Sequence, residues 1–201
     1  VRLTTRYDKK DFLQSLMGTI HETGHALYEQ NLPQDLLALP VGQARSMGIH
    51  ESQSLFFEMQ IGRSTEFLKS IHPYIIEFFG KKEELALDNL IKIYSKVEAS
   101  FIRVDSDEVT YASHVILRYE IERALMNGEI ETSDIPDMWN DKMQEALGLN
   151  TKGNYKDGCM QDVHWSEGLF GYFPSYTLGA MYAAQQFNAV KKAYPNIYES
   201  I

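Results

Sequence analysis

Two histidines four residues apart, His21 and His25, stand in the sequence HETGH and could bind one metal ion together. On a helix, side chains at this spacing lie on one face, so both imidazoles can reach the same ion. Glu22 lies beside that face, where its carboxylate can hold a metal-bound water without ligating the ion. Zinc bound by two histidines and one carboxylate keeps a position open for water, whose pKa falls to about 7. The motif therefore predicts metal-assisted hydrolysis, with Glu22 taking a proton and returning it to a leaving amine.

This chemistry requires a helix over residues 13–29, and the sequence around the motif favours one. Asp8 or Asp11 is expected to cap its N-terminus. The alternative is a surface helix that carries two histidines by chance, and the further motifs below count against it. Apolar residues recur at helical spacing along the segment, namely Leu13, Leu16, Met17, Ile20, Ala26 and Leu27.

A third metal ligand is required, and Glu51 is the best candidate. It lies in the segment GIHESQS, residues 48–54, one proline-containing loop beyond the histidines. His50 is the nearest competitor. Glu29 and Glu58 are weaker candidates, because acidic residues on helices usually face solvent.

The rest of the chain is predicted to be mainly helical. Residues 1–7 alternate apolar or β-branched with polar side chains and are expected to form a strand. The edge of that strand could receive an extended peptide, or the strand only completes a small sheet. An apolar, core-forming segment is expected at residues 71–80. Helices are expected from GIHESQS to about Ser70 and over residues 83–104, 111–125, 134–147 (with Pro136 in its first turn and Gly148 after it) and 177–193.

Arg103 stands at a break in the helical pattern, within a charged cluster. Its guanidinium could hold a substrate carboxylate through two parallel hydrogen bonds. Composition alone favours a different role, in which Arg103 pairs with Asp105 or Asp107.

Two further histidines, His72 and His114, are not assigned to the site. His72 precedes a proline and is assigned no chemistry. His114 and Arg118 share a helix face, and a surface pairing with Glu122 explains them as well as a site does.

The segment 158–176 is dense in Gly, Trp, His and Tyr, unlike a simple core helix. Hydrolysis of a peptide bond develops an oxyanion, and a phenol or imidazole donor stabilises it. His164, Tyr172 and Tyr176 can supply such donors, although aromatic side chains more often only pack.

Composition sets limits on partners and compartment. The 201 residues suffice for one well-packed domain, and a net charge of −9 without any basic run argues against nucleic acid. No run of about 18 apolar residues exists that could span a membrane. The single cysteine, Cys159, excludes an internal disulfide framework and fits a reducing compartment. The chain lacks an initiator Met, so a piece of a longer protein is expected.

With these motifs in place, the chain resembles the M32 family of metallocarboxypeptidases, the thermostable carboxypeptidase type. Ser106 stands where the family pattern has alanine, and an upstream Asp-x-Arg-x-Thr pattern survives only in residues 1–4. Residues 1–201 would then be the catalytic zinc-binding region, without the N-terminal helical part and the C-terminal end. The resemblance rests on four segments in the family's order: HETGH (21–25), HESQ (50–53), IRVDSD (102–107) and GCMQDVHW (158–165).

The resemblance also implies a role for each candidate residue. Tyr172 is favoured over Tyr176 because its Gly-Tyr-Phe setting is similar to a tyrosine region of related helical dipeptidyl carboxypeptidases. The implied roles are metal ligation by His21, His25 and Glu51; acid–base catalysis by Glu22; recognition of the substrate's C-terminal carboxylate by Arg103 and Arg2; hydrogen bonding to the scissile carbonyl by His164 and Tyr172; and substrate binding by Tyr176.

The expected protein is a zinc-dependent carboxypeptidase, with Co²⁺ or Mn²⁺ as alternative metals and peptides as substrates. The resemblance implies a mainly α metallopeptidase fold with a small strand or hairpin lining the cleft, a homodimer and a cytoplasmic location. An endopeptidase or dipeptidyl carboxypeptidase with the same metal centre is one alternative. A non-catalytic metal-binding helical fragment is another. Glu22 counts against the latter, because a structural zinc site has no use for a base and is commonly closed by cysteines.

Overall fold

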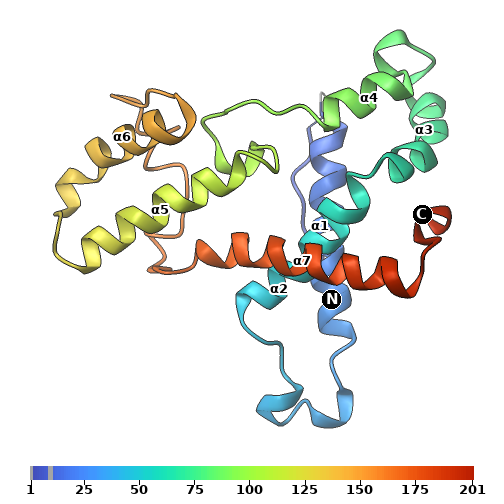
Figure 1. Ribbon diagram of the computed structural model, residues 1–201, viewed down its shortest axis with the longest axis horizontal. Helices are drawn as coiled ribbons and strands as arrows, with labels where there is room; N and C mark the ends of the chain where they lie inside the picture. Colours follow the sequence, from blue (N-terminus) through green and yellow to red (C-terminus); the bar gives the residue numbers. More distant parts are fainter. Residues whose placement is uncertain (1, 9–10) are drawn as a thin grey trace. The chain divides into compact units, whose positions relative to one another are not determined.

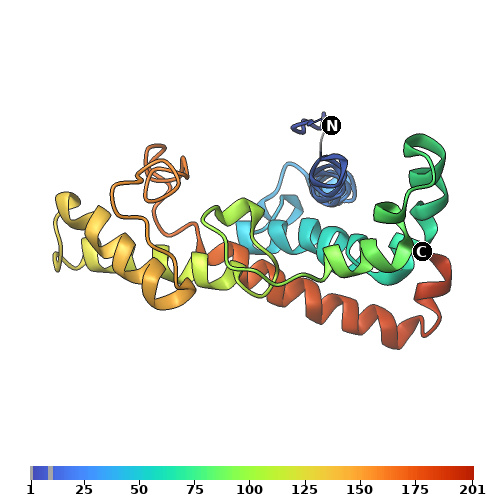
Figure 2. The same ribbon diagram turned by 90° about the horizontal axis from the view of Figure 1, so that it is seen from above.

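The protein is described by a computed structural model that covers residues 2–8 and 11–201 (Figures 1 and 2). The chain forms two compact units. The first unit comprises Val1–Tyr94 and Leu178–Ile201, and the second comprises Ser95–Thr177. The elements that matter for function are α1 (Phe12–Gln30), α2 (Met47–Leu55), the π-helix η3 (Phe56–Gly62), α3 (Thr65–Phe79), α4 (Leu87–Tyr94), the 3-10 turn η5 (Arg103–Asp105), α5 (Tyr111–Met126), α6 (Ile135–Leu147) and α7 (Pro174–Ala193).

In the first unit, α1 packs against α2 and η3. The predicted helix around the HETGH motif is confirmed as α1, and Asp11 caps it by accepting a hydrogen bond from the Gln14 amide at 3.1 Å. Asp8 therefore does not take the capping role. The helix positions His21 and His25 one turn apart, as their spacing requires.

The second unit is built on α5, α6 and the irregular segment that follows α6. Its core consists of Leu117 and Ile121 from α5 packed on Trp139 and Met143 from α6. The predicted helices at 111–125 and 134–147 are confirmed. Gly148 ends α6 with a φ of 71°, in the left-handed region that glycine adopts without strain.

The predicted strand at the N-terminus is wrong. Residues 2–7 form no strand, and none exists elsewhere in the part of the chain that the structure describes; Val1 lies outside that part. Leu3 and Tyr7 are 45% and 72% exposed, so the alternating pattern has neither a partner strand nor an apolar layer to cover. A segment with alternating apolar and polar residues forms a stable strand only when it has a partner strand and an apolar layer to cover. The small strand or hairpin element expected to line a cleft is therefore withdrawn.

The helix predicted over residues 83–104 is also wrong in its length. Only α4, Leu87–Tyr94, is α-helical, and the chain is irregular from Ser95 to Ile102. The side chain of Asp107 accepts a hydrogen bond from the Glu98 amide at 3.0 Å, which holds this irregular segment in place. The helix expected up to Ser70 is divided into α2, η3 and the start of α3.

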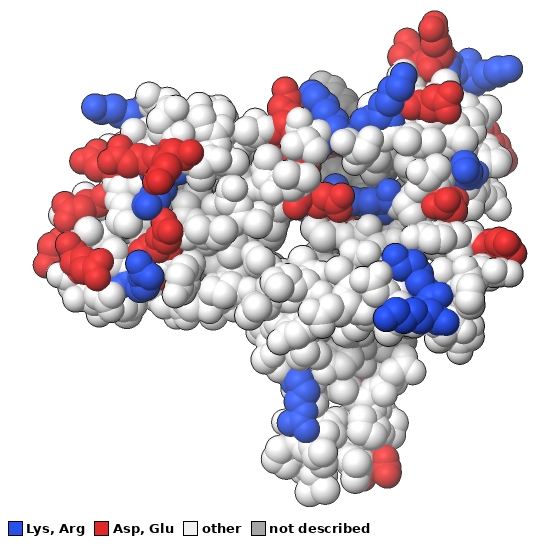
Figure 3. All heavy atoms as spheres, in the orientation of Figure 1, with Lys and Arg blue, Asp and Glu red and all other residues white. Residues whose placement is uncertain are grey.

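The surface of the second unit is acidic over α6 (Figure 3). The exposed acidic residues of α6 and of the turn before it are Glu131, Asp134, Asp137, Asp141 and Glu145. This face is unsuited to a phosphate backbone, in agreement with the net charge of −9. No helix in the described ranges is long and apolar enough to cross a membrane.

Candidate metal centre and substrate-binding residues

His21, His25 and Glu51 form a cluster in the first unit that could hold a metal ion, which we call the candidate metal centre. One ligand atom from each residue lies within 4.8 Å of the others. The Nε2 atoms of His21 and His25 lie 3.6 and 3.7 Å from Oε2 of Glu51, so both imidazoles turn the same nitrogen toward the carboxylate. Two imidazole nitrogens and one carboxylate oxygen are one of the donor sets that catalytic zinc sites use. The residues present therefore fit a divalent metal.

Glu51 reaches the histidines because α2 approaches α1 very closely at Gly24. A Cβ atom on Gly24 would lie only 2.5 Å from the backbone oxygen of Gln53, a contact that real side chains do not make. Gly179 on α7 gives a similar close approach on the other side, where a Cβ would lie 2.7 Å from Cβ of Glu51. Glu51 itself is only 4% exposed.

Gly24→Ala is expected to weaken metal binding, because α2 must move away from α1 and takes Glu51 with it. Gly18→Ala is the matched control on the same helix, where the added Cβ would meet only the Thr5 hydroxyl at 3.1 Å. Titration of both variants with Zn²⁺ against a competing chelator measures the effect. Equal zinc affinity in Gly24→Ala and the unmutated protein would contradict this explanation of the geometry.

The outward nitrogen of His21 is held by Glu58, which lies in the π-helix η3. Nδ1 of His21 donates to Oε2 of Glu58 at 2.8 Å, and Arg63 holds the other carboxylate oxygen at 3.0 Å. Glu58 thus fixes the ring so that Nε2 faces Glu51. Single π-helical turns occur frequently at functional sites, where they redirect side chains.

The outward nitrogen of His25 is held by a chain of two hydrogen bonds, through His50 to Glu29. Its Nδ1 lies 2.6 Å from Nδ1 of His50, and Nε2 of His50 lies 2.8 Å from Oε1 of Glu29. Each of these hydrogen bonds has one donor and one acceptor if Nδ1 of His25 donates to Nδ1 of His50 and Nε2 of His50 donates to Glu29. The three other candidates for the third ligand therefore support the histidines instead. Glu58 and His50 bind them directly, and Glu29 binds through His50.

Glu58→Gln is expected to lower metal affinity by about 10- to 100-fold, the usual effect of removing a partner of a metal-bound histidine. Glutamine keeps the size of the side chain and loses the charge that orients His21. Glu66→Gln, on α3, is a control that touches neither histidine. Chelator competition at fixed pH gives the affinity, and an unchanged value for Glu58→Gln would show that His21 needs no such support.

Burial and neighbouring charges act on the two histidines in opposite ways. Burial, together with the proximity of His21 and His50, lowers the pKa of His25 to about 4, so this imidazole is neutral and able to ligate at neutral pH. Burial alone would also lower the pKa of His21, but the hydrogen bond and the charge of Glu58 outweigh it and raise that pKa. Burial would raise the pKa of Glu58, yet His21 and Arg63 hold it below its ordinary value. Glu22 lies half-buried beside His21 on α1.

In the second unit, Arg103 is buried and bound to Asp162, 59 residues further along the chain. Nε and Nη2 of Arg103 donate to Oδ1 of Asp162 at 3.0 and 2.7 Å, and Nη1 donates to the Tyr111 hydroxyl at 2.7 Å. The pairing with Asp105 or Asp107 that composition favoured is wrong. The fold brings a distant carboxylate to Arg103 instead of a neighbouring one.

Asp162 also accepts a hydrogen bond from Nε of Arg118 at 2.6 Å. Arg118 is 0% exposed and lies over the ring of Trp139, and burial lowers its pKa to about 10. Burial would raise the pKa of Asp162, but the two arginines hold it below its ordinary value. The surface pairing with Glu122, one of the two explanations left open for His114 and Arg118, is therefore wrong. Asp162, to which no role was assigned, was identifiable from the sequence only as part of the GCMQDVHW motif.

The aromatic candidates come together in the second unit. Nε2 of His164 lies 3.0 Å from the Tyr176 hydroxyl, and the ring centroids of His164 and Tyr172 are 5.3 Å apart. His164 is buried, and this burial together with the charge of Arg103 lowers its pKa. A neutral imidazole and phenol hydroxyls are suitable donors for an oxyanion.

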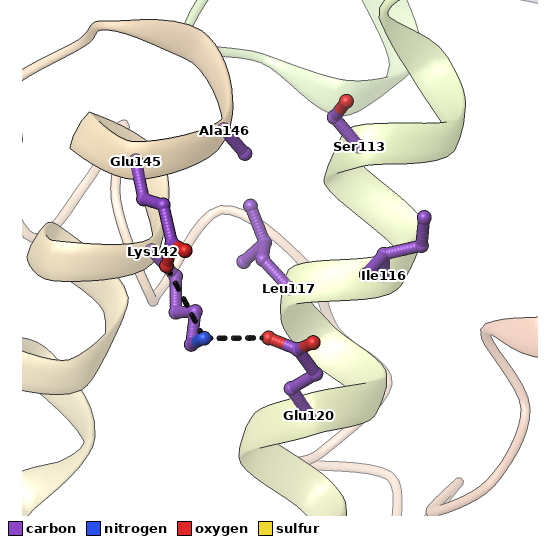
Figure 4. Close-up of a pocket in the computed structure, with 7 residues that line it drawn as sticks. All are labelled: Ser113, Ile116, Leu117, Glu120, Lys142, Glu145 and Ala146. Carbon is purple, nitrogen blue, oxygen red and sulfur yellow. Dashed lines mark hydrogen bonds and ion pairs between the residues drawn. The ribbon is translucent and has the colours of Figure 1, made fainter.

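The predicted site residues thus form two groups. The first unit holds the candidate metal centre and Glu22, and the second unit holds Arg103 and the aromatic donors. Arg2 is exposed in the irregular N-terminal segment of the first unit. A shallow pocket between α5 and α6 contains none of them (Figure 4). Its Lys142 pairs with Glu120 at 2.8 Å, so its charges satisfy one another and we assign it no role.

Comparison with known proteins gives consistent matches over nearly all of the chain. The model of the family described as Carboxypeptidase Taq (M32) metallopeptidase matches residues 1–201. Carboxypeptidase 1 of Bacillus subtilis is 48% identical over 92% of this chain and 37% of its own length. Thermostable carboxypeptidase 1 of Thermus thermophilus is 49% identical over 93% of this chain and 36% of its own length.

Solved structures agree with these matches. Metallocarboxypeptidase 1 of Trypanosoma cruzi has a TM-score of 0.90 and 52% identity, covering 94% of this chain and 40% of that one. A Pyrococcus furiosus carboxypeptidase has a TM-score of 0.91 and 40% identity, covering 98% of this chain and 39% of that one. The mainly helical fold is therefore confirmed. The chain spans 36–37% of the length of the two curated relatives named above.

Proposed function

Because this chain belongs to the Carboxypeptidase Taq (M32) metallopeptidase family, we propose that it carries the metal centre of a carboxypeptidase, which hydrolyses the C-terminal peptide bond of peptides. The observation that carries the proposal is the convergence of His21, His25 and Glu51, with both Nε2 atoms facing one carboxylate oxygen. The chain covers little more than a third of its relatives, so the activity is proposed for the whole protein.

His21, His25 and Glu51 would hold the metal, for which we propose zinc, with Co²⁺ or Mn²⁺ as alternatives. Zinc supplies Lewis-acid chemistry at such a site: it lowers the pKa of a water and polarises the scissile carbonyl. Glu22 takes the proton of the attacking water and passes it to the leaving amine. Its place beside His21, off the face that carries the ligands, suits that task.

The second group of residues would act on the substrate. His164 and Tyr172 donate hydrogen bonds to the carbonyl oxygen as it becomes negatively charged, and Tyr176 contacts the substrate beside them. Arg103, together with Arg2, would recognise the free C-terminal carboxylate. Three of the N–H groups of Arg103 are bound by Asp162 and Tyr111, and a guanidinium has five, so it retains donors for a carboxylate. The homodimer and the cytoplasmic location implied by the resemblance stay predictions.

Peptides with a free C-terminus and the same peptides with a C-terminal amide test the proposal. An exopeptidase that requires the carboxylate cuts the first set and spares the second, releasing single residues that mass spectrometry identifies. Release of dipeptides would instead support a dipeptidyl carboxypeptidase. Equal cleavage of amidated peptides would show an endopeptidase with the same metal centre.

A further inference from the structure

The inward face of α5 carries buried polar side chains at intervals of four residues: His114, Arg118 and Glu122. Each is at most 4% exposed. Charged side chains are almost never this buried unless they are paired, so their partners show what the face does. Arg118 donates to the backbone oxygen of His114 at 2.7 Å and lies over the ring of Trp139. Its carboxylate partner and both hydrogen-bond donors to Glu122 lie in residues 162–173, which we call the aromatic loop because it carries His164 and Tyr172.

Glu122 binds the aromatic loop at two points. Oε1 accepts a hydrogen bond from the indole Nε1 of Trp165 at 2.8 Å, and Oε2 accepts one from the backbone amide of Gly171 at 3.0 Å. These two donors are the direct chain neighbours of His164 and Tyr172. One carboxylate therefore fixes the loop next to both proposed oxyanion donors.

The loop has no helix or strand of its own, and it is held by turn hydrogen bonds, such as that from the Leu169 amide to the His164 oxygen at 2.8 Å, together with the two bonds to Glu122. Gly168 and Gly171 have φ values of 72° and 79°, in the left-handed region that favours glycine and is typical of turns. Trp165 also packs edge-on against Trp139, with ring centroids 6.0 Å apart, which keeps the indole in line with Glu122. A loop between two such turns keeps one shape only when its hydrogen bonds hold it.

We propose that Glu122 is a positioning residue for peptide hydrolysis: its carboxylate binds the aromatic loop at both Trp165 and Gly171 and so fixes the relative positions of His164 and Tyr172. This inference rests on the proposed function, since it concerns residues that act in that reaction. Glu122 touches no reacting atom. Its effect on the rate comes from geometry, and a misplacement of about 1 Å can cost on the order of 100-fold.

Glu122→Gln in the full-length protein tests the inference, because an amide offers one acceptor oxygen where the carboxylate offers two. Glutamine can bind Trp165 or Gly171 but must turn an N–H donor toward the other. We expect kcat to fall about 10- to 100-fold, with KM and metal content unchanged. Hydrogen exchange at the Gly171 amide, followed by mass spectrometry, is expected to become faster.

Two further variants separate positioning from general stability. Glu120→Gln lies on the same helix, where its carboxylate pairs with Lys142 and not with the loop, and is expected to behave as the unmutated protein (Figure 4). Trp165→Phe removes the indole donor while keeping an aromatic ring beside Trp139, and it is also expected to lower kcat. Because Glu122 and Trp165 belong to one hydrogen-bonded network, their effects in the double variant should not simply add.

An unchanged kcat in Glu122→Gln would overturn the inference. So would a loss of activity that merely follows a loss of folded protein, with exchange in the aromatic loop unaltered. Failure of the proposed function gives a different result, in which the unmutated protein releases no C-terminal residue. In that case Glu122 has no role in hydrolysis, while the exchange rate of the Gly171 amide still shows whether Glu122 holds the aromatic loop.

Discussion

Glu22→Gln is expected to lower kcat for release of C-terminal residues by about 10²- to 10⁴-fold, the usual contribution of a general acid–base group. Glutamine matches glutamate in size but cannot take a proton from the attacking water. Metal content should stay the same, since the clustered ligand atoms come from His21, His25 and Glu51 and not from Glu22. Activity and bound metal are measured on the same preparations.

Thr23→Ser is the matched control for this prediction. Its hydroxyl donates to the backbone oxygen of Thr19 at 2.7 Å, and serine retains that bond one residue away from Glu22. Its kcat should remain near that of the unmutated protein. A Glu22→Gln variant that holds metal and hydrolyses peptides at the normal rate would remove Glu22 from the mechanism.

Tyr172→Phe is expected to lower kcat by about 10²- to 10³-fold, because one donor to the developing oxyanion is lost and the ring remains. KM should change little, since this hydrogen bond strengthens only as the carbonyl oxygen becomes charged. The measurement is kcat and KM for one free-acid peptide. The aromatic packing against His164 is retained, so loss of structure does not confuse the result.

Tyr176→Phe decides between the two tyrosines. The Tyr176 hydroxyl lies 3.0 Å from Nε2 of His164, so its loss should act through the imidazole and cost less than the loss of the Tyr172 hydroxyl. A larger fall in kcat for Tyr176→Phe than for Tyr172→Phe would reverse the assignment.

The sequence predicted those parts of the site that depend on spacing within one helix. His21 and His25 lie together because α1 has about 3.6 residues per turn, and the apolar pattern sufficed to identify that helix. The distance from Glu51 to these histidines depends on Gly24, whose missing side chain admits the backbone of α2. A glycine inside a helix does not reveal from the sequence alone which backbone approaches it.

Interactions between distant residues were predicted less well. Local charge patterns suggested Asp105 or Asp107 as the partner of Arg103, and the surface as the place of Arg118. In the structure both arginines are buried and bind Asp162, which lies 59 residues after Arg103 and 44 residues after Arg118. Ion pairs across such separations are set by packing of the whole second unit. The N-terminal alternation failed for a related reason, since a strand needs a partner elsewhere in the chain.

Metal content of the purified protein tests the central claim most directly, with His25→Ala and Glu51→Ala measured beside it. These variants each remove one ligand from the candidate metal centre, and circular dichroism controls for folding. We expect one tightly bound metal ion per chain in the unmutated protein and its loss in both variants while they remain folded. Retention of the ion by folded His25→Ala or Glu51→Ala protein would contradict the proposed ligand set.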